Sequence, residues 1–331
     1  MATKPKSRPT VSIIVPAFNS ESYIAETLQS ALAQTFDDFE VLVVDDGSTD
    51  QTVEVAERFA LIDERVRVIQ QSNQGVSIAR NSALAVARGE FLALLDSDDV
   101  WRCDYLTEQL RVLREWKADI VSANASNLGG PFDESLLNAV RPGVHLLSLM
   151  DLIDDEQSVC IFSVFHRRVF EGIGRFDRSM SGNEDYDYWL RAAAYGFRIV
   201  FNATPLGWYR RRPDSLSANE IKMLAGIQRP LRKLRERIAP GSLESHAIDQ
   251  KLTLFERRRL IALAKAAILG GKASASQEHF DALYRLTGRW NYRFIAIVAR
   301  QVPALVGCAY ALKRAAHRPL TPIKMSVTSP M

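Results

Sequence analysis

The chain has 331 residues, 47% of them hydrophobic, so it can bury a large core and is not a disordered protein. Its 42 basic and 39 acidic residues give a net charge of +3, which offers no electrostatic reason to expect nucleic-acid binding. Three widely spaced cysteines argue against a disulfide framework and favour a reducing compartment. Residues 1–10 are polar and basic and lack the apolar stretch of a signal peptide, so we expect a flexible tail and a cytoplasmic protein.

Strand and helix patterns alternate through the first hundred residues. The strands are short, apolar and rich in β-branched residues, and the helices carry apolar residues on one face. This alternation predicts an α/β fold with a mainly parallel sheet covered by helices, whose functional groups gather at the carboxyl ends of the strands. The predicted strands span 11–18, 39–46, 66–70 and 91–95, and the predicted helices span 23–36, 76–87 and a segment opened by a Ser48-x-x-Gln51 capping box.

Polar side chains follow three of these predicted strands. Carboxylates crowded at the end of a buried strand raise one another's proton affinity unless a positive group lies among them, and a divalent cation is the usual one. Oxygen ligands suit Mg²⁺ or Mn²⁺, which tend to hold a phosphate-bearing substrate. We therefore predict a cation bound to a diphosphate at this edge of the sheet. The polar residues are Asn19 after the first strand, Asp45 and Asp46 at the second, and Asp96, Asp98 and Asp99 after the fourth.

Two common nucleotide-binding motifs are absent from the sequence. There is no G-x-x-x-x-G-K-[ST] loop for a nucleoside triphosphate, and no G-x-G-x-x-G follows the first strand to bind a dinucleotide. Both of the usual doubly wound alternatives are therefore disfavoured.

Three segments carry a specific resemblance. VSIIVPAFN, VLVVDDGSTDQT and NQGVSIARNSALAVARGEFLALLDSDD occur in this order across residues 11–100. They resemble the nucleotide-binding half of family 2 glycosyltransferases of the GT-A fold, and the likeness continues more loosely to about residue 220. The resemblance implies a GT-A-type, Rossmann-like sheet, a nucleoside diphosphate sugar donor that is usually uridine-linked, and Mn²⁺ or Mg²⁺. It also implies an inverting single displacement by an acceptor hydroxyl.

The same resemblance implies roles for residues on the donor side. Asp46 would accept a hydrogen bond from the uracil ring. Arg80 would help to hold the nucleotide, the alternative being a solvated helix arginine. Asp99 would only cap the next helix. The remaining assignments are Pro16 and Phe18 lining the base, Asp96 nearest the ribose and as a metal ligand, and Asp98 as the principal metal ligand.

A second acidic cluster lies in SGNEDYDYWLRAAAYG, residues 181–196. Acids in the first turn of a helix are expected from the helix dipole alone. The resemblance, however, implies that Asp185 is the general base that takes the proton of the acceptor hydroxyl, with Glu184 as the alternative or as a residue that orients the acceptor.

The run WYRRRPDSLS, residues 208–217, resembles a loop that folds over the diphosphate. Many relatives carry a histidine metal ligand where this chain has Arg212. Because arginine does not ligate a cation, we expect Arg212 to pair with phosphate oxygens, and a solvated loop is the alternative. Trp101 and Tyr105 either stack on an acceptor sugar or pack in the core.

The sequence predicts a catalytic domain at 11–222 and a helical extension at 223–331. For this extension, packing, homo-oligomerisation and contact with the inner face of a membrane that carries a lipid-linked acceptor stay open. Residues 294–312 approach membrane-spanning length, but Arg300, Gln301 and Pro303 interrupt them, so a packed helix pair is favoured over peripheral membrane contact.

The resemblance thus implies an inverting glycosyltransferase that moves a sugar from a nucleoside diphosphate sugar to a glycan or lipid-linked acceptor, and we expect it to act in cell-surface polysaccharide or glycolipid assembly. The main alternative is a non-catalytic nucleotide-sugar-binding module on the same fold. A nucleotidyltransferase is disfavoured, because PAFNSESY stands where a glycine-rich basic loop would follow the first strand.

Overall fold

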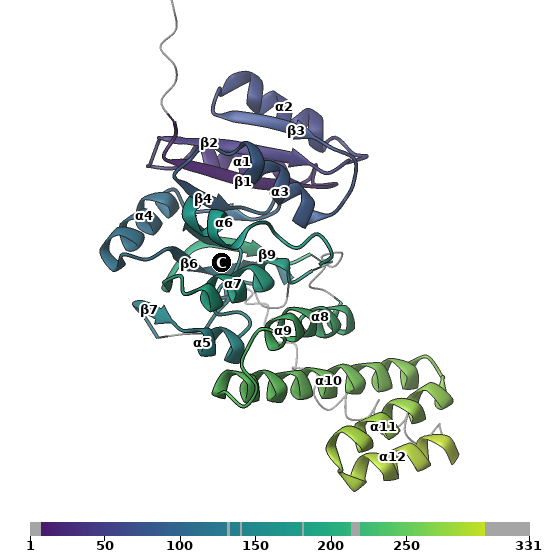
Figure 1. Ribbon diagram of the computed structural model, residues 1–331. Coiled ribbons are helices and arrows are strands. Elements are labelled where there is room, and N and C mark those ends of the chain that lie inside the picture. The colour runs from purple at the N-terminus through teal and green to yellow at the C-terminus, as the bar shows by residue number, and fades with distance from the viewer. Residues whose placement is uncertain (1–7, 131–132, 140, 181, 213–218, 302–331) are drawn as a thin grey trace, which may run out of the picture. The chain divides into compact units, whose positions relative to one another are not determined.

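The computed structural model describes residues 8–130, 133–139, 141–180, 182–212 and 219–301 (Figure 1). The chain divides into two compact units, Met1–Leu252 and Thr253–Met331. The first contains the sheet, and the second is helical in its described part.

The first four strands form the parallel half of the sheet. β1 (Val11–Ala17) pairs in parallel with β2 (Phe39–Asp45) on one side and β4 (Phe91–Leu94) on the other, and β2 pairs in parallel with β3 (Val66–Gln70). All four strands lie where the sequence predicts them. Because β1 is central, the chain turns to opposite sides after β1 and after β3, and the carboxyl ends of β1, β2 and β4 meet at this switch point.

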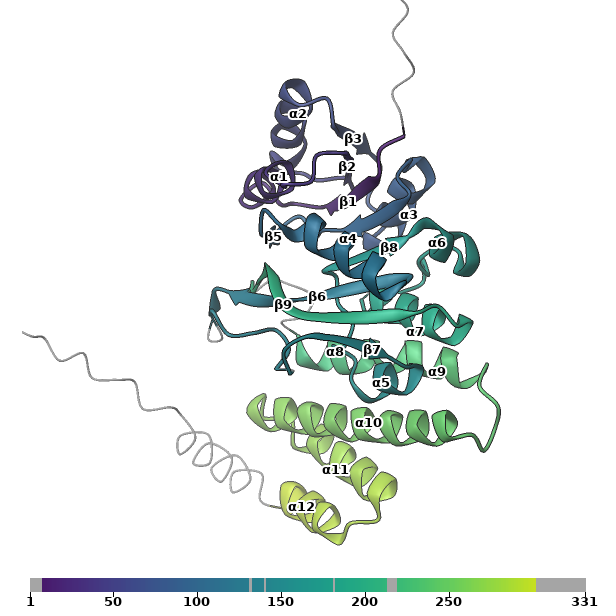
Figure 2. The ribbon, with the colours of Figure 1, turned by 90° about the vertical axis from the view of Figure 1, so that its left-hand side faces the viewer.

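The second half of the sheet is mixed rather than parallel. β8 (Ser163–His166) runs antiparallel to both β4 and β6 (Ile120–Leu128), whereas β6 and β9 (Ile199–Arg210) are parallel. β5 (Val100–Trp101) and β7 (Val144–Leu147) each pair antiparallel with β9 (Figure 2). In the described residues the strand order is β3-β2-β1-β4-β8-β6-β9-β5, with β7 also on β9.

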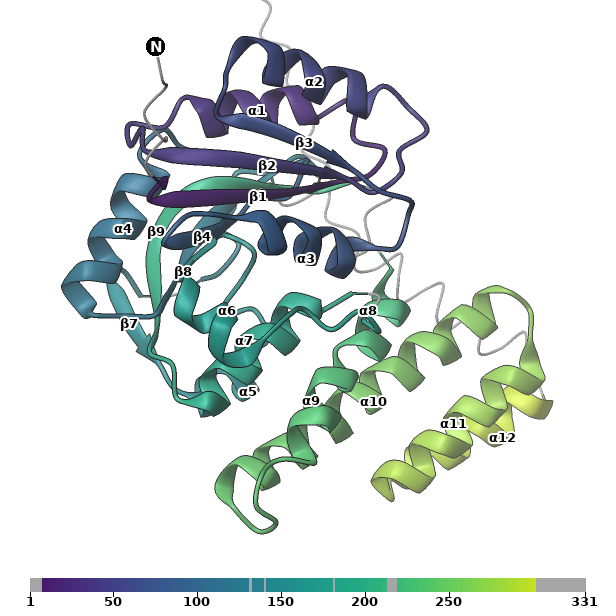
Figure 3. The same ribbon diagram turned by 45° about the horizontal axis from the view of Figure 1, so that its top comes forward.

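Helices cover both faces of the parallel half. Figure 3 shows α1 (Ile24–Leu32) and α2 (Thr52–Ile62) on one face of β1, β2 and β3, and α3 (Val76–Val86) on the other. The capping box predicted at Ser48 is wrong. Ser48 Oγ instead accepts a hydrogen bond from the Asn19 amide at 2.9 Å, and Asp50 Oδ1 accepts from the Thr52 amide at 3.0 Å.

The remaining helices of the first unit surround the mixed half of the sheet. Trp101 and Tyr105 are buried and stack on each other with ring centroids 4.0 Å apart. They therefore pack in the core, and their rings are not available to stack on an acceptor sugar. The side chains of Leu106, Leu110 and Leu113 are buried in α4. The helices are α4 (Tyr105–Trp116), α5 (Leu149–Asp154), α6 (Arg167–Ile173), α7 (Glu184–Tyr195), α8 (Glu220–Gly226) and α9 (Gln228–Arg235).

The first unit extends past the boundary expected at residue 222. α9 buries Leu231 and Leu234 in this unit, and Lys233 forms ion pairs with Asp177 and Asp187. At the other end, residues 1–7 of the expected tail lie outside the described residues. Thr10 already belongs to the fold, since its amide donates to the Asp38 carbonyl at 3.1 Å.

The second unit confirms the predicted helical extension. α10 (Leu243–Leu269) runs into it and is followed by α11 (Ala273–Thr287) and α12 (Trp290–Gln301), which lie side by side. Leu260, Leu283 and Tyr292 form its core. None of the helices in the described residues is long and apolar enough to cross a membrane. Residues 302–312 of the expected helix pair lie outside the described part.

Candidate active site

The loops after β1 and β2 are tied together at the switch point. Asn19 has a left-handed backbone (φ 47°), and its Oδ1 accepts from the Thr49 amide at 2.9 Å while its own amide donates to Ser48 Oγ. Gly47 follows β2 with φ 75°, and a Cβ there would lie 2.8 Å from the Asn73 nitrogen. Glycine is therefore required where the loop after β2 approaches the segment that follows β3.

Asp46 is buried beside the loop that follows β3. Its Oδ1 accepts from Gln71 Nε2 at 2.7 Å and from the Gln74 amide at 3.0 Å, and its Oδ2 accepts from the Gly75 amide at 2.7 Å. A carboxylate offers about four acceptor sites, so one on Oδ2 is left for a ligand. The hydrogen bond from Asp46 to a uracil ring stays a prediction.

Phe18 and Pro16 differ in their access to a ligand. Phe18 is exposed at the rim, where an aromatic face is available to a base. Pro16 is buried within β1, opposite Val44 of β2. A direct contact of Pro16 with a base therefore gains no support from its position.

The acids after β4 lie in a loop that α1 fixes. Thr27 Oγ1 donates to the carbonyls of Ser97 at 3.0 Å and Asp99 at 2.8 Å. Burial and the neighbouring Asp96 raise the pKa of Asp98 to about 6, although Arg212 opposes the shift. Arg212 Nε lies 3.3 Å from Asp98 Oδ2, and its guanidinium lies over the Tyr23 ring at 5.2 Å. Arg212 thus belongs to the acidic cluster, and residues 213–217 of the same run lie outside the described residues.

Asp99 does not cap the following helix, so that prediction is wrong. α4 begins six residues later at Tyr105, and Asp99 Oδ1 instead accepts from the Arg210 amide at 2.9 Å across to β9. Asp99 Oδ2 is buried without a hydrogen-bond partner in the described residues. Burial, Asp98 and Asp96 raise the Asp99 pKa well above its usual range.

Arg210 is a site residue that the sequence analysis missed. Its Nε donates to the Asp98 carbonyl at 2.8 Å, and its guanidinium lies over the Tyr23 ring at 5.1 Å. The guanidinium groups of Arg210 and Arg212 both lie over the Tyr23 ring, while Arg211 Nε donates to Asn127 Oδ1.

Arg80 joins the two acidic clusters. It is only 2% exposed, which excludes a solvated helix arginine. One of its terminal nitrogens donates to Asp96 Oδ1 at 2.8 Å and the other to Glu184 Oε1. Burial opposes its charge, but Asp96 and Glu184 outweigh burial and raise the Arg80 pKa. Because these donors face carboxylates, direct contact of Arg80 with a nucleotide stays a prediction.

Glu184 and Asp185 are the first two residues of α7, next to the Arg80 guanidinium. Glu184 is buried and neutralised by Arg80, whereas Asp185 is partly buried and accepts from the Tyr186 amide at 2.8 Å. Burial and the adjacent Glu184 raise the pKa of Asp185 to about 6. A carboxylate with such a pKa binds a proton more readily than an ordinary aspartate, which suits a general base.

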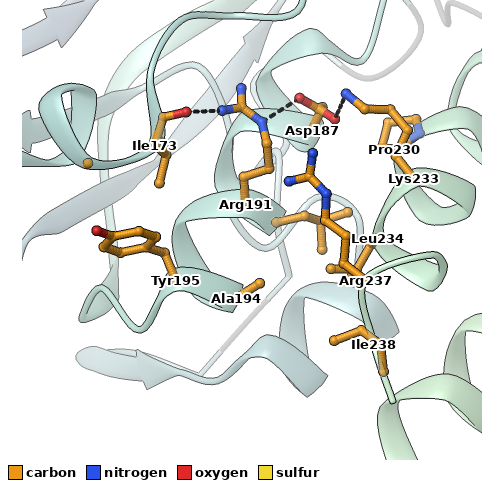
Figure 4. A pocket seen from close by; sticks show the side chains of 12 residues that line it. Ile173, Asp187, Arg191, Ala194, Tyr195, Pro230, Lys233, Leu234, Arg237 and Ile238 are labelled. Atoms are coloured by element: carbon orange, nitrogen blue, oxygen red, sulfur yellow. Dashed lines mark hydrogen bonds and ion pairs between the residues drawn. The ribbon is translucent and has the colours of Figure 1, made fainter. Parts of the chain in front are cut away.

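α7 is held in place from a different side. Asp187 pairs with Arg191 at 2.8 Å and with Lys233 of α9 at 2.6 Å, and Arg191 also donates to the Ile173 carbonyl at 2.8 Å (Figure 4). These residues line a pocket of about 330 Å³ between α6, α7 and α9. None of the predicted site residues lines this pocket, and its ion pairs hold α7 against α9.

The acids suit a hard divalent cation. The arginines engage Oδ1 of Asp96 and Oδ2 of Asp98, so the other oxygen of each carboxylate remains for a cation. Among the described residues, no group of three or more His, Cys, Asp or Glu side chains is arranged to hold a metal ion. A cation here therefore needs further oxygens from a substrate or water.

Comparison with known sequences identifies relatives of the same kind. The family model described as glycosyl transferase family 2 matches residues 12–174. TuaG of Bacillus subtilis (strain 168), named for teichuronic acid biosynthesis, is 31% identical over 65% of this chain and 84% of its own. EpsH of the same organism is 32% identical over 65% of each chain, and GlyA of Streptococcus pneumoniae is 28% identical over 83% of this chain. The match spans 65% of the length of EpsH and 41% of that of GlyA, less than two thirds of each.

Solved structures share the fold. S. aureus TarS 1–349 in complex with UDP is 22% identical, with a TM-score of 0.59 over 95% of this chain and 94% of its own. The mannosyltransferase PcManGT from Pyrobaculum calidifontis, in complex with GDP-Man and Mn²⁺, is 21% identical with a TM-score of 0.57, over 94% of this chain and 89% of its own. The architecture expected from the sequence is thereby confirmed. Together with the match to TuaG and to the family model, it shows that the chain belongs to glycosyl transferase family 2.

Proposed function

We propose that this protein transfers a sugar from a nucleoside diphosphate sugar to an acceptor hydroxyl, with inversion at the anomeric carbon. One observation carries the proposal. The buried Arg80 pairs with Asp96 on the donor side and with Glu184 at the start of α7, so Asp185, the next residue of α7, lies at the same site. An acidic pair for a diphosphate-bound cation and a separate carboxylate of raised pKa are the two parts that such a displacement needs.

The donor side is assigned to the loop after β4 and the end of β9. Asp96 and Asp98 would hold Mn²⁺ or Mg²⁺, which when bound supplies positive charge at the leaving diphosphate. Arg212 adds a second positive group within reach of Asp98 and of phosphate oxygens. Phe18 and Asp46 would contact the base. TarS was solved with UDP, and this supports uracil as the base.

The acceptor side is assigned to Asp185. The acceptor oxygen forms a bond to C1 of the sugar as the bond from C1 to the diphosphate oxygen breaks. The diphosphate leaves with the electron pair, and Asp185 takes the proton of the acceptor hydroxyl. Glu184 keeps its pairing with Arg80 and positions that guanidinium. The proposed acceptor is a glycan or lipid-linked glycan in cell-surface polysaccharide assembly, and the name of TuaG, which refers to teichuronic acid biosynthesis, supports a role in glycan synthesis.

The test separates donor binding from chemistry. Thermal unfolding of the wild type is measured with UDP, GDP, CDP and ADP, each with and without Mn²⁺. A ligand at about a hundred times its dissociation constant adds roughly 2.7 kcal/mol of stability, which is readily detected. We expect a shift with UDP that depends on Mn²⁺.

Asp185→Asn then tests the role of the base. We expect it to retain the UDP shift and to lose sugar transfer, because the side chain acts only in the chemical step. Asp187→Asn is not a suitable control, since Asp187 anchors α7. Asp104→Asn, in a half-buried pair with Arg102, is the matched substitution. Wild-type transfer by Asp185→Asn would disprove the base assignment, and no shift with any nucleotide would contradict a nucleotide-binding site of either kind, catalytic or not.

A further inference from the structure

The second unit presents an apolar stripe on α12, defined as Trp290, Phe294 and Ile297. Their spacing of four and three residues places them on one face of the helix. They are 68%, 68% and 49% exposed within the described residues. The side chains of Tyr292 and Ala296 lie on another face of α12 and are buried. α12 is therefore apolar on two sides, and the core of this unit uses only one of them.

Cationic side chains flank the apolar stripe. The Arg293 guanidinium lies 5.1 Å from the Trp290 ring centroid and 5.4 Å from that of Tyr284. Arg285 and Arg289 are exposed at the turn between α11 and α12. A guanidinium on aromatic rings beside exposed apolar side chains keeps its charge at the water boundary while the rings stay available.

Charge is unevenly distributed along the sequence. The last acidic residue is Asp281, and the segment from Ala282 to the end carries +8, while everything before it carries −5, which together give the +3 of the chain. Such asymmetry favours contact with an anionic surface. The eight cationic residues are Arg285, Arg289, Arg293, Arg300, Lys313, Arg314, Arg318 and Lys324.

We propose that the apolar stripe and its flanking arginines dock the second unit on a bilayer surface that contains anionic lipids. Trp290 and Phe294 suit the boundary between headgroups and acyl chains, and arginines suit the headgroup phosphates. Nucleic acid has matching charge, but its polyanionic backbone gives no use for Phe294 and Ile297. The docking is peripheral. It does not depend on the proposed transferase activity.

The experiment measures sedimentation of the full-length protein with vesicles of phosphatidylcholine alone or with about one-third phosphatidylglycerol. We expect binding mainly to the anionic vesicles. Phe294→Ser with Ile297→Ser should weaken it about tenfold or more, since both side chains leave the interface. Arg285→Gln with Arg289→Gln should weaken binding to anionic vesicles by about fivefold per arginine.

The matched control is Leu61→Ser with Ile62→Ser in α2. These apolar side chains are 86% and 80% exposed, but Asp63 and Glu64 follow them. This control should bind vesicles like the wild type. Unchanged melting temperatures in all variants support the proposal, because the substituted side chains are exposed.

Three outcomes would overturn the docking surface. The first is equal binding to both kinds of vesicle. The second is wild-type binding by the Phe294 and Ile297 variant. The third is a lowered melting temperature or a changed oligomeric state of that variant, which would mean that protein covers the apolar stripe.

Discussion

Arg80→Met removes the cation between the two acidic clusters, and we expect it to destabilise the first unit. The Arg80 and Glu184 side chains are 2% and 8% exposed, so the variant leaves a buried carboxylate without its partner. Breaking a buried ion pair in this way costs about 3–5 kcal/mol. The Asp96 side chain is 32% exposed and water replaces much of that pairing, so we expect the lower end, about 3 kcal/mol.

In thermal unfolding followed by near-ultraviolet circular dichroism, that loss corresponds to a decrease in melting temperature of about 6–12 °C. Arg67→Met is the matched control. It breaks a 3.4 Å pair with Glu40 in which the arginine is 44% exposed, and we expect it to cost less than about 1 kcal/mol.

A double-mutant cycle tests the cause. Adding Glu184→Gln to Arg80→Met should recover part of the loss, because a neutral amide costs less to bury than an unpaired carboxylate. The reasoning is refuted if Arg80→Met costs no more than Arg67→Met, or if the loss is the same with Glu184→Gln present.

Three further results are expected. Burial and Glu184 raise the pKa of Asp185 to about 6. Because the base must be unprotonated, we expect kcat/KM to fall about tenfold per pH unit below that value. A pH profile that is flat through this range would contradict the assignment. Asp98→Asn should abolish the Mn²⁺-dependent part of the thermal shift by UDP, and an unchanged shift would remove Asp98 from the metal site. Lys233 and Ser179 hold the pKa of Asp177 below its usual 3.8 against the effect of burial, so this carboxylate adds stability above that pH and loses it as the pH falls further. Lys233→Met should lower the urea midpoint at neutral pH and flatten its decline in acid, and parallel declines in both proteins would argue against the pairing.

The features that the sequence predicts correctly are local. β1, β2, β3 and β4 are short apolar runs bounded by polar residues, and the acids that follow β2 and β4 lie at one edge because the strands are parallel. The acidic residues in the first turn of α7 can likewise be recognised directly in the sequence. These patterns need only a few neighbouring residues to be recognised.

The features that the sequence does not predict depend on distant partners. Arg80 reaches Asp96 across 16 residues and Glu184 across 104, and no local pattern indicates either pairing. The spacing of Ser48 and Gln51 matches a helix cap, but the Ser48 hydroxyl instead accepts a hydrogen bond from the amide of Asn19, which lies in another loop. The direction of β8 is also unreadable, because a four-residue apolar strand has the same alternation whichever way it runs.

The support of α7 has a consequence for how acceptor preference can change. Asp185 and Asp187 are two residues apart, so their side chains leave the helix about 200° apart. The proposed base is therefore aligned by contacts with Arg191 and Lys233 that lie on a different face of α7 from Asp185. Residues around the acceptor can vary while the orientation of the base is preserved. A new acceptor could then be accommodated without rebuilding the machinery of proton transfer.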